Sequence, residues 1–95
     1  MFIQIIRLKS NLPEEELLKR ARERESSFKA LPGLQQKYYV RLEEKGQYAG
    51  IDVWDSKESM LSFRQTELAA SIPQAYEITE PPKVESLDML FKLRD

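Results

Sequence analysis

The sequence contains no cysteine and no histidine. Without cysteine the protein has no disulfide bond and no thiolate nucleophile. A zinc site is not expected, because cysteine and histidine are the side chains that most often bind zinc. Haem ligated by histidine and a histidine-based nucleophile relay are excluded for the same reason.

The sequence also lacks an excess of either charge and any long apolar run. Fifteen Lys and Arg residues against sixteen Asp and Glu residues give a formal net charge of −1, and the two signs are mixed along the chain. This excludes the basic stripe that is typical of proteins that bind nucleic acid or anionic lipid. The first residues, MFIQIIRLKS, lack the basic start of a signal peptide, and no apolar run approaches the length of a membrane span. We therefore expect a soluble, cytoplasmic protein.

The composition is typical of a globular protein. Hydrophobic residues make up 41% and charged residues 33% of the 95 positions, which separates the chain from disordered sequences. We expect residues 1–95 to form a single domain. A domain of this size buries roughly two-thirds of its unfolded surface, so association with a second copy would stabilise it further.

Apolar periodicity and turn residues predict six elements. Pro13 followed by three glutamates is typical of a helix start, and the LPGL sequence ends that helix. The EKG sequence joins two strands as a hairpin, with Gly46 free to adopt a positive φ. Asp55 or Ser56 caps a second helix, and Glu58 completes a capping-box pattern. The predicted elements are strand 2–9, helix 13–30, strand 35–43, strand 47–54, helix 56–72 and strand 84–93.

This β-α-β-β-α-β order is the ferredoxin-like, or split βαβ, arrangement of the α+β class. It predicts a four-stranded antiparallel sheet with both helices on one face. The other face of such a sheet is ordinarily polar, because nothing within the same chain covers it.

Both faces of the predicted sheet carry apolar side chains. The set assigned to the face under the helices is Ile3, Ile5, Tyr38, Val40, Leu42, Ala49, Ile51, Val53, Leu87, Met89, Phe91 and Leu93. The set assigned to the opposite face is Phe2, Gln4, Ile6, Leu8, Tyr39, Arg41, Tyr48, Gly50, Asp52, Trp54, Asp88, Leu90 and Lys92. The second set is too apolar and aromatic to remain exposed as a continuous patch. We expect a second copy to cover it, in a homodimer that stacks sheet on sheet.

Charged residues within this second set leave two interpretations open. Arg41, Asp52 and Asp88 would be costly in a buried interface unless they are paired or hydrated. In one interpretation, Tyr48 and Trp54 pack the dimer core and Arg41 pairs with an acidic residue. In the other, aromatic walls around a few polar groups form a pocket for a small molecule.

Two stretches, LPGLQQKYYV and GIDVWDSKESMLSF, resemble the antibiotic biosynthesis monooxygenase-like family of the dimeric α+β barrel superfamily. The shared features are Pro32-Gly33 after the first helix, the Trp54–Ser56 segment that ends a strand, and Phe63 in the second helix. The resemblance implies a homodimer of ferredoxin-like subunits whose sheets form a barrel. It implies a ligand cavity between each sheet and its helices or within the barrel. Known activities of such proteins are oxidation of aromatic polyketides or quinols by O₂ without a cofactor, and haem breakdown.

The haem-degrading branch does not fit this sequence. Its members use an Asn in the first strand, where this chain has Ile6, and a His in the second helix, which this chain cannot supply. Only Trp54 matches their pattern. We therefore expect no cofactor and no metal.

Cofactor-free oxidation of an aromatic or quinol-type substrate remains compatible with the residues. Asp52 would act as the base, activated by apolar surroundings, and Arg41 would stabilise the resulting anion. Trp54 and Tyr48 would stack on the ring. The expected ligand-binding set is Trp54, Tyr48, Tyr39, Gln4 and Phe63. The alternative is a homodimeric module without catalytic activity that binds a small molecule or only assembles.

Overall fold

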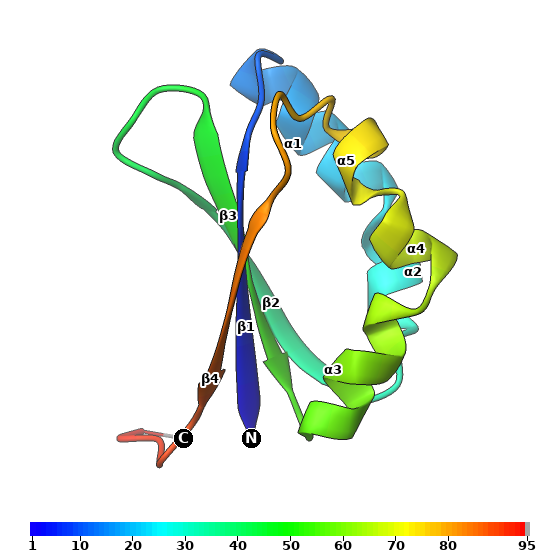
Figure 1. Ribbon diagram of the computed structural model, residues 1–95, viewed down its shortest axis with the longest axis vertical. Coiled ribbons are helices and arrows are strands. Elements are labelled where there is room, and N and C mark those ends of the chain that lie inside the picture. Colours follow the sequence, from blue (N-terminus) through cyan, green and yellow to red (C-terminus); the bar gives the residue numbers. More distant parts are fainter. Residues whose placement is uncertain (95) are drawn as a thin grey trace.

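The computed structural model describes residues 1–94 and has an antiparallel sheet of four strands in the order β2-β3-β1-β4. The helices all lie on one side of this sheet (Figure 1). The strands are β1 (Phe2–Lys9), β2 (Leu34–Arg41), β3 (Gln47–Trp54) and β4 (Lys83–Asp88). The structure therefore confirms the predicted ferredoxin-like α+β fold.

Each of the two predicted helices is broken into shorter pieces. Within residues 1–94 the helices are α1 (Glu14–Glu23), α2 (Glu25–Lys29), α3 (Lys57–Arg64), α4 (Glu67–Ala70) and α5 (Ile72–Ala75). The first break is at Arg24, whose φ of −101° and ψ of 0° leave the helical region. Its guanidinium Nη2 donates hydrogen bonds to the Leu68 carbonyl and to Ser71 Oγ. Arg24 therefore connects the first helical segment to the second.

A hydroxyl side chain, that of Thr66, starts a new helical turn inside the second predicted helix. Ser56, rather than Asp55, caps α3, and its Oγ accepts a hydrogen bond from the Ser59 N–H. Thr66 caps α4 in the same way, accepting from the Ala69 N–H. Such caps compete with continuation of the helix.

Gly46 has a φ of +79°, as expected for the hairpin turn.

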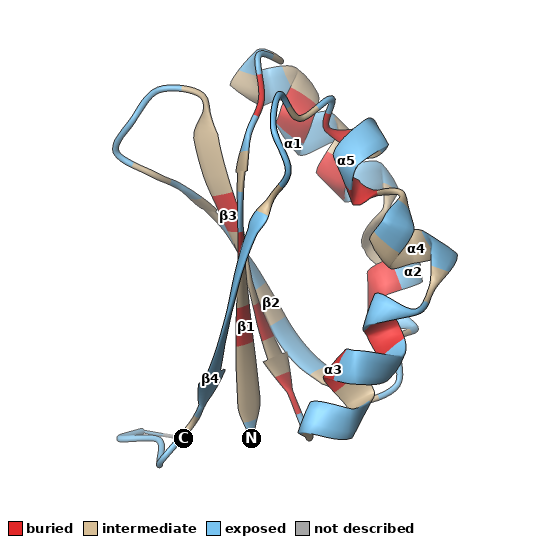
Figure 2. Ribbon diagram, in the orientation of Figure 1, coloured by how far each residue is buried: buried red, intermediate tan, exposed pale blue. Residues whose placement is uncertain are grey.

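The assignment of the two sheet faces was wrong. The set that contains Gln4, Asp52 and Trp54 lies under the helices, where these three side chains are 1–2% exposed. The alternating set with Ile3, Ile51 and the other aliphatic residues faces away from the helices. Figure 2 shows the buried positions between the sheet and the helical layer. The alternation correctly separated the two sets but carried no information on which set the helices cover, because both are apolar.

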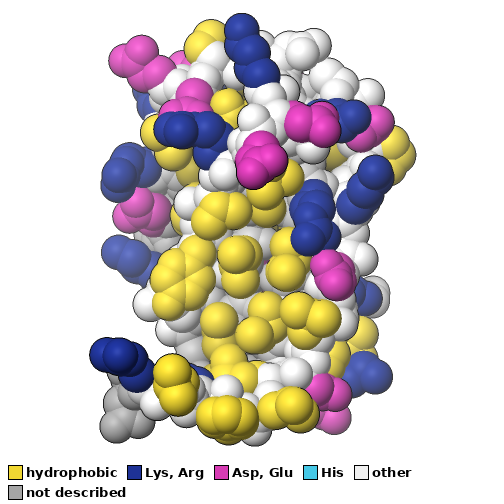
Figure 3. All heavy atoms as spheres, turned by 90° about the vertical axis from the view of Figure 1, so that its left-hand side faces the viewer, with side chains coloured by type: hydrophobic (Ala, Val, Ile, Leu, Met, Phe, Trp, Pro, Cys, Tyr) yellow, Lys and Arg dark blue, Asp and Glu magenta, His cyan; other side chains and the backbone are white. Residues whose placement is uncertain are grey.

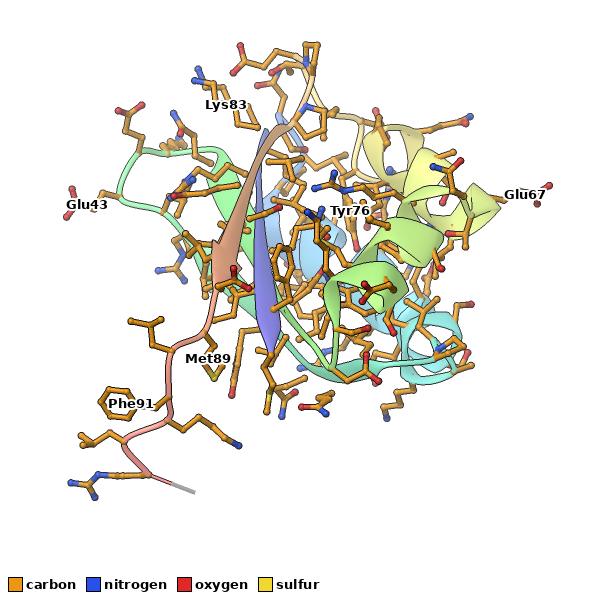
Figure 4. The ribbon with its side chains drawn as sticks, turned by 60° about the horizontal axis from the view of Figure 1, so that its bottom comes forward. Glu43, Glu67, Tyr76, Lys83, Met89 and Phe91 are labelled. Carbon is orange, nitrogen blue, oxygen red and sulfur yellow. The ribbon has the colours of Figure 1, made fainter. Side chains whose placement is uncertain are left out.

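The core between sheet and helices is largely aromatic. Trp54, on β3, packs against Phe63 on α3 with ring centroids 5.3 Å apart, and Phe63 packs against Phe28 on α2 at 6.0 Å. Tyr76 also lies between the helices and the sheet (Figure 4). These rings connect both helical segments to the centre of the sheet.

The last predicted strand is shorter than expected. β4 ends at Asp88, and the following segment, which carries Met89 and Phe91, runs away from the sheet (Figure 4). Leu90, Phe91 and Leu93 are 91%, 77% and 86% exposed. The Met89 N–H still donates a hydrogen bond of 3.0 Å to the Met1 carbonyl, and the apolar side chains at 90, 91 and 93 then extend beyond the sheet. Among the residues described, no helix is long and apolar enough to cross a membrane.

Candidate functional site

A cavity of about 210 Å³ lies between the sheet and the helical layer. Its floor is formed by the three adjacent strands β1, β2 and β3, and its roof by α1, α2 and the start of α5. The walls are mainly apolar and aromatic, as in most small-molecule sites. Its principal side chains are Ile6, Leu8, Leu17, Phe28, Tyr39, Tyr48 and Tyr76.

A surface ion pair borders the cavity. Arg41, at the end of β2, donates hydrogen bonds from Nε and Nη2 to the two carboxylate oxygens of Glu14 on α1, at 2.6 and 3.0 Å. The Arg41 guanidinium lowers the pKa of Glu14 through this hydrogen bonding, against a smaller opposing effect of desolvation. The Arg41 side chain is 71% exposed, so water screens its charge strongly.

A second ion pair is buried beneath the cavity. Lys37 on β2 lies directly opposite Asp52 on β3, and its Nζ donates a hydrogen bond of 2.7 Å to Asp52 Oδ1. The side chains are 11% and 1% exposed. Lys37 lines the cavity, whereas Asp52 is not among the residues that line it. Of the two partners, only Lys37 is therefore in contact with the cavity.

Gly50 provides the space that the ammonium occupies. A Cβ at this position would lie 2.9 Å from Lys37 Nζ, which is too close for an undisturbed contact. Glycine inside a strand often marks a place where another group approaches the backbone closely. The Lys37 side chain thus passes over Gly50 to reach Asp52.

Two tyrosine hydroxyls at the cavity remain neutral over a wide pH range. Burial of its phenol, together with the charges of Asp52 and Glu25 and the proximity of Tyr76, raises the pKa of Tyr39 to about 12. Burial also raises the pKa of Tyr76, although the neighbouring Arg24 opposes this. Neither hydroxyl is suited to serve as a base near neutral pH.

The sequence of the chain places it in a known family. The family model for antibiotic biosynthesis monooxygenases matches residues 1–72. The chain belongs to the antibiotic biosynthesis monooxygenase family. No curated protein sequence matches it.

Several solved structures share the fold of the chain. SnoaB, a cofactor-independent oxygenase from Streptomyces nogalater, has a TM-score of 0.77 at 14% identity, over 99% of this chain and 97% of its own. A family member from Bordetella bronchiseptica has a TM-score of 0.77 at 19% identity, over 95% and 98%. A protein of unknown function from Nitrosomonas europaea has a TM-score of 0.76 at 16% identity, over 96% and 90%. At these identities the similarity establishes the fold.

The candidate residues from the sequence separate into two groups. Tyr39, Tyr48 and Arg41 line the cavity. Asp52 does not line it, but accepts a hydrogen bond from Lys37, which does. Trp54, Phe63 and Gln4 are buried but are not among the lining residues; their place is in the core beside the cavity.

Gln4 and Trp54 are held in the core in different ways. With its amide oriented by the hydrogen-bond network, Gln4 Oε1 accepts hydrogen bonds of 3.1 Å from both Nη2 and Nε of Arg64 on α3. The buried indole N–H of Trp54 has no hydrogen-bond partner within residues 1–94. Trp54 therefore contributes through packing.

Sequence reasoning missed Lys37, Phe28 and Gly50 as parts of the site. A signal for Lys37 was present: the hairpin register that pairs Tyr39 with Gly50 also places Lys37 opposite Asp52. Opposite charges at facing positions of neighbouring strands are a recognised stabilising pair. Phe28 could not be assigned in this way, because its approach to the sheet depends on how the helices pack.

Proposed function

We propose that the chain is a monooxygenase-like protein that binds a small aromatic or quinol-type molecule in the cavity between its sheet and helices. The observation that carries this proposal is the apolar, aromatic cavity with an ammonium group at its floor. Membership of the antibiotic biosynthesis monooxygenase family supports it, as does the shared fold of SnoaB, a cofactor-independent oxygenase.

The cavity volume limits the size of the ligand. An engineered apolar cavity of about 150 Å³ is large enough to bind benzene, so a volume of about 210 Å³ suits one or two fused rings. Typical sites for larger ligands measure about 300–1,000 Å³. Phe28, Tyr39 and Tyr48 supply faces and edges against which a ring can stack.

The reaction requires no cofactor, because the substrate supplies all the electrons. For a phenol with hydrogen at the para carbon, the balanced reaction is phenol + O₂ → quinone + H₂O. One oxygen atom forms the new C=O bond at that carbon. The other leaves as water with the hydroxyl hydrogen and the displaced ring hydrogen. Loss of the hydroxyl proton comes first, since the phenolate donates electrons to O₂ more readily than the phenol.

The test uses 1-naphthol, a two-ring phenol, with calorimetric binding and oxygen uptake as measurements. We expect saturable binding, and conversion to 1,4-naphthoquinone that incorporates one atom from isotopically labelled O₂. Replacing Leu18, which lines the cavity and is 43% exposed, by Trp should reduce both, because the indole would occupy the cavity rim.

The matched control is Leu61→Trp, since Leu61 is also helical, is 42% exposed and does not line the cavity. This variant should bind and react as the unmodified chain does. Binding without oxygen uptake would instead support a non-catalytic module that only binds small molecules. No binding at all would refute the assignment of the cavity.

We also propose that the protein is a homodimer formed through the outer face of its sheet. Figure 3 shows this face, where hydrophobic side chains form a central patch with charged residues around it. The residues of the patch alternate along the four strands with those under the helices. They are Ile3, Ile5, Tyr38, Val40, Ile51, Val53 and Leu87. We propose that a second copy covers this patch, because an exposed apolar patch is unfavourable on an isolated subunit. The expected location of the dimer is the cytoplasm.

The dimer predicts that a charge at the centre of this face prevents association. Ile51→Lys should convert the dimer to a monomer in sedimentation velocity, because the ammonium would be buried without a partner. Leu61→Lys, on the helical side of the molecule, should leave the dimer intact. A chain that already sediments as a monomer without any substitution would contradict the proposal.

A further inference from the structure

We propose that Lys37 makes the cavity selective for the deprotonated form of a hydroxyarene, a phenolate or an enolate, over the neutral hydroxyl compound. This inference rests on the proposed function, since it assumes that the cavity holds an aromatic ring. It adds the protonation state of the ligand and the residue that recognises it.

The ammonium of Lys37 lies beside two aromatic side chains of the cavity. Nζ of Lys37 lies 4.8 Å from the ring centroid of Phe28 and 5.1 Å from that of Tyr39. Both rings line the cavity. A ligand ring packed against these two side chains would therefore have its substituents next to the ammonium.

The ammonium of Lys37 has more hydrogen-bond donors than Asp52 uses. An ammonium has three N–H groups. Within residues 1–94, Nζ of Lys37 donates one hydrogen bond, to Asp52 Oδ1. Its other N–H groups have no oxygen partner among these residues, and the ammonium lies over the rings of Phe28 and Tyr39. We infer that an oxygen atom of a ligand can accept from them.

Lys37 and Asp52 differ in their contact with the cavity. Asp52 is 1% exposed and does not line the cavity, whereas Lys37 does. A ligand oxygen therefore meets the positive group first. A hydrogen bond between an ammonium and an oxyanion is roughly twice as strong as one between neutral groups, so the anionic ligand gains more than the neutral one.

Arg41, the cation expected from the sequence to serve this role, is less suited to it. Its guanidinium is already bound to both carboxylate oxygens of Glu14 and is 71% exposed. Water screens a charge in that position, whereas Lys37 is 11% exposed. Asp52 then acts as a positioning residue, holding the ammonium over Gly50 rather than contacting the ligand.

The selectivity would serve the proposed oxidation directly. The phenolate is the form of the substrate that reduces O₂, so a cavity that binds this form raises the fraction of reactive substrate. The proton lost from the hydroxyl passes to solvent as the ligand binds. Stabilisation of an oxyanion by fixed donors in a site with little water is among the strongest effects available to a protein.

The test compares two single-ring probes, 4-nitrophenol and its methyl ether 4-nitroanisole. Measurements are made at a pH at which free 4-nitrophenol is mostly protonated. Binding to the protein should produce the long-wavelength absorption band of the nitrophenolate. We expect 4-nitrophenol to bind at least about tenfold more tightly than 4-nitroanisole, as a hydrogen bond to a charged group predicts.

The double variant Lys37→Met/Asp52→Leu removes both charges without leaving either one buried alone. It should bind the two probes about equally and produce no nitrophenolate band. Lys45→Met, on the exposed β2–β3 turn, is the control and should behave as the unmodified chain does. The comparison of the two probes in the unmodified chain tests the proposal even if the double variant does not fold.

The outcomes separate this inference from the proposed function. Equal binding of both probes to the unmodified chain, without the nitrophenolate band, would overturn the role of Lys37 and leave the cavity assignment intact. A band that persists in the double variant would also overturn it. Failure of the chain to bind either probe would overturn both proposals.

Discussion

Replacing Lys37 by methionine is expected to lower the free energy of unfolding by about 3–5 kcal/mol. The substitution keeps an unbranched apolar side chain, one atom shorter than lysine, but leaves the Asp52 carboxylate, which is 1% exposed, without its ammonium partner. A buried charge that has lost its counter-ion is among the most destabilising defects in a protein interior. Chemical denaturation followed by circular dichroism measures the change.

The double variant Lys37→Met/Asp52→Leu should recover most of this loss, since well-packed apolar residues often replace a buried ion pair without cost. Asp52→Leu alone should cost less than Lys37→Met. The flexible stem of Lys37, already 11% exposed, can carry its ammonium toward water, whereas Asp52 cannot leave the core. Equal stability of the two single variants would contradict the buried geometry described for this pair.

Replacing Trp54 by alanine is expected to lower the free energy of unfolding by about 3–5 kcal/mol. Trp54 is 1% exposed and stacks on Phe63, which in turn contacts Phe28, so its removal opens a cavity at the junction of the sheet and both helical segments. For a domain of this size the thermal midpoint should fall by more than about 10 °C. Calorimetry checks the value.

Two controls accompany this substitution. Trp54→Phe should cost much less, because it keeps an aromatic ring and because the indole N–H has no hydrogen-bond partner within residues 1–94. Leu61→Ala, at a helical position that is 42% exposed, should change the stability by less than about 0.5 kcal/mol. A Trp54→Ala variant as stable as Leu61→Ala would show that the indole does not hold the two layers together.

Much of the fold was predictable from local patterns. The hairpin around Gly46, the strands that flank it and the order of the elements follow from alternation and turn residues, which act over a few positions of the chain. The breaks at Arg24 and Thr66 were missed. Arg24 departs from the helix to contact Leu68 and Ser71, over 40 positions away.

The candidate site was predictable only in part. Alternation correctly grouped Tyr39, Tyr48 and Asp52 on one face of the sheet, and the aromatic content of that face correctly indicated that it is covered. The prediction that a second copy covers this face was wrong. The helices cover it instead, because their side chains Phe28 and Phe63 pack against an aromatic face as readily as a second copy would. The sequence analysis assigned the stabilisation of the substrate anion to Arg41 and not to Lys37, although both residues lie on the same face of β2.

The sequence by itself determined the element order, the separation of the sheet residues into two apolar sets and the exclusion of histidine-dependent chemistry. Only the tertiary structure decided which set the helices bury, which cation pairs with Asp52, and where the cavity lies. The physical reason is that strand periodicity has a period of two and is symmetric between the faces of a sheet. Burial and ion pairing depend instead on the docking of helices whose contacts span most of the chain.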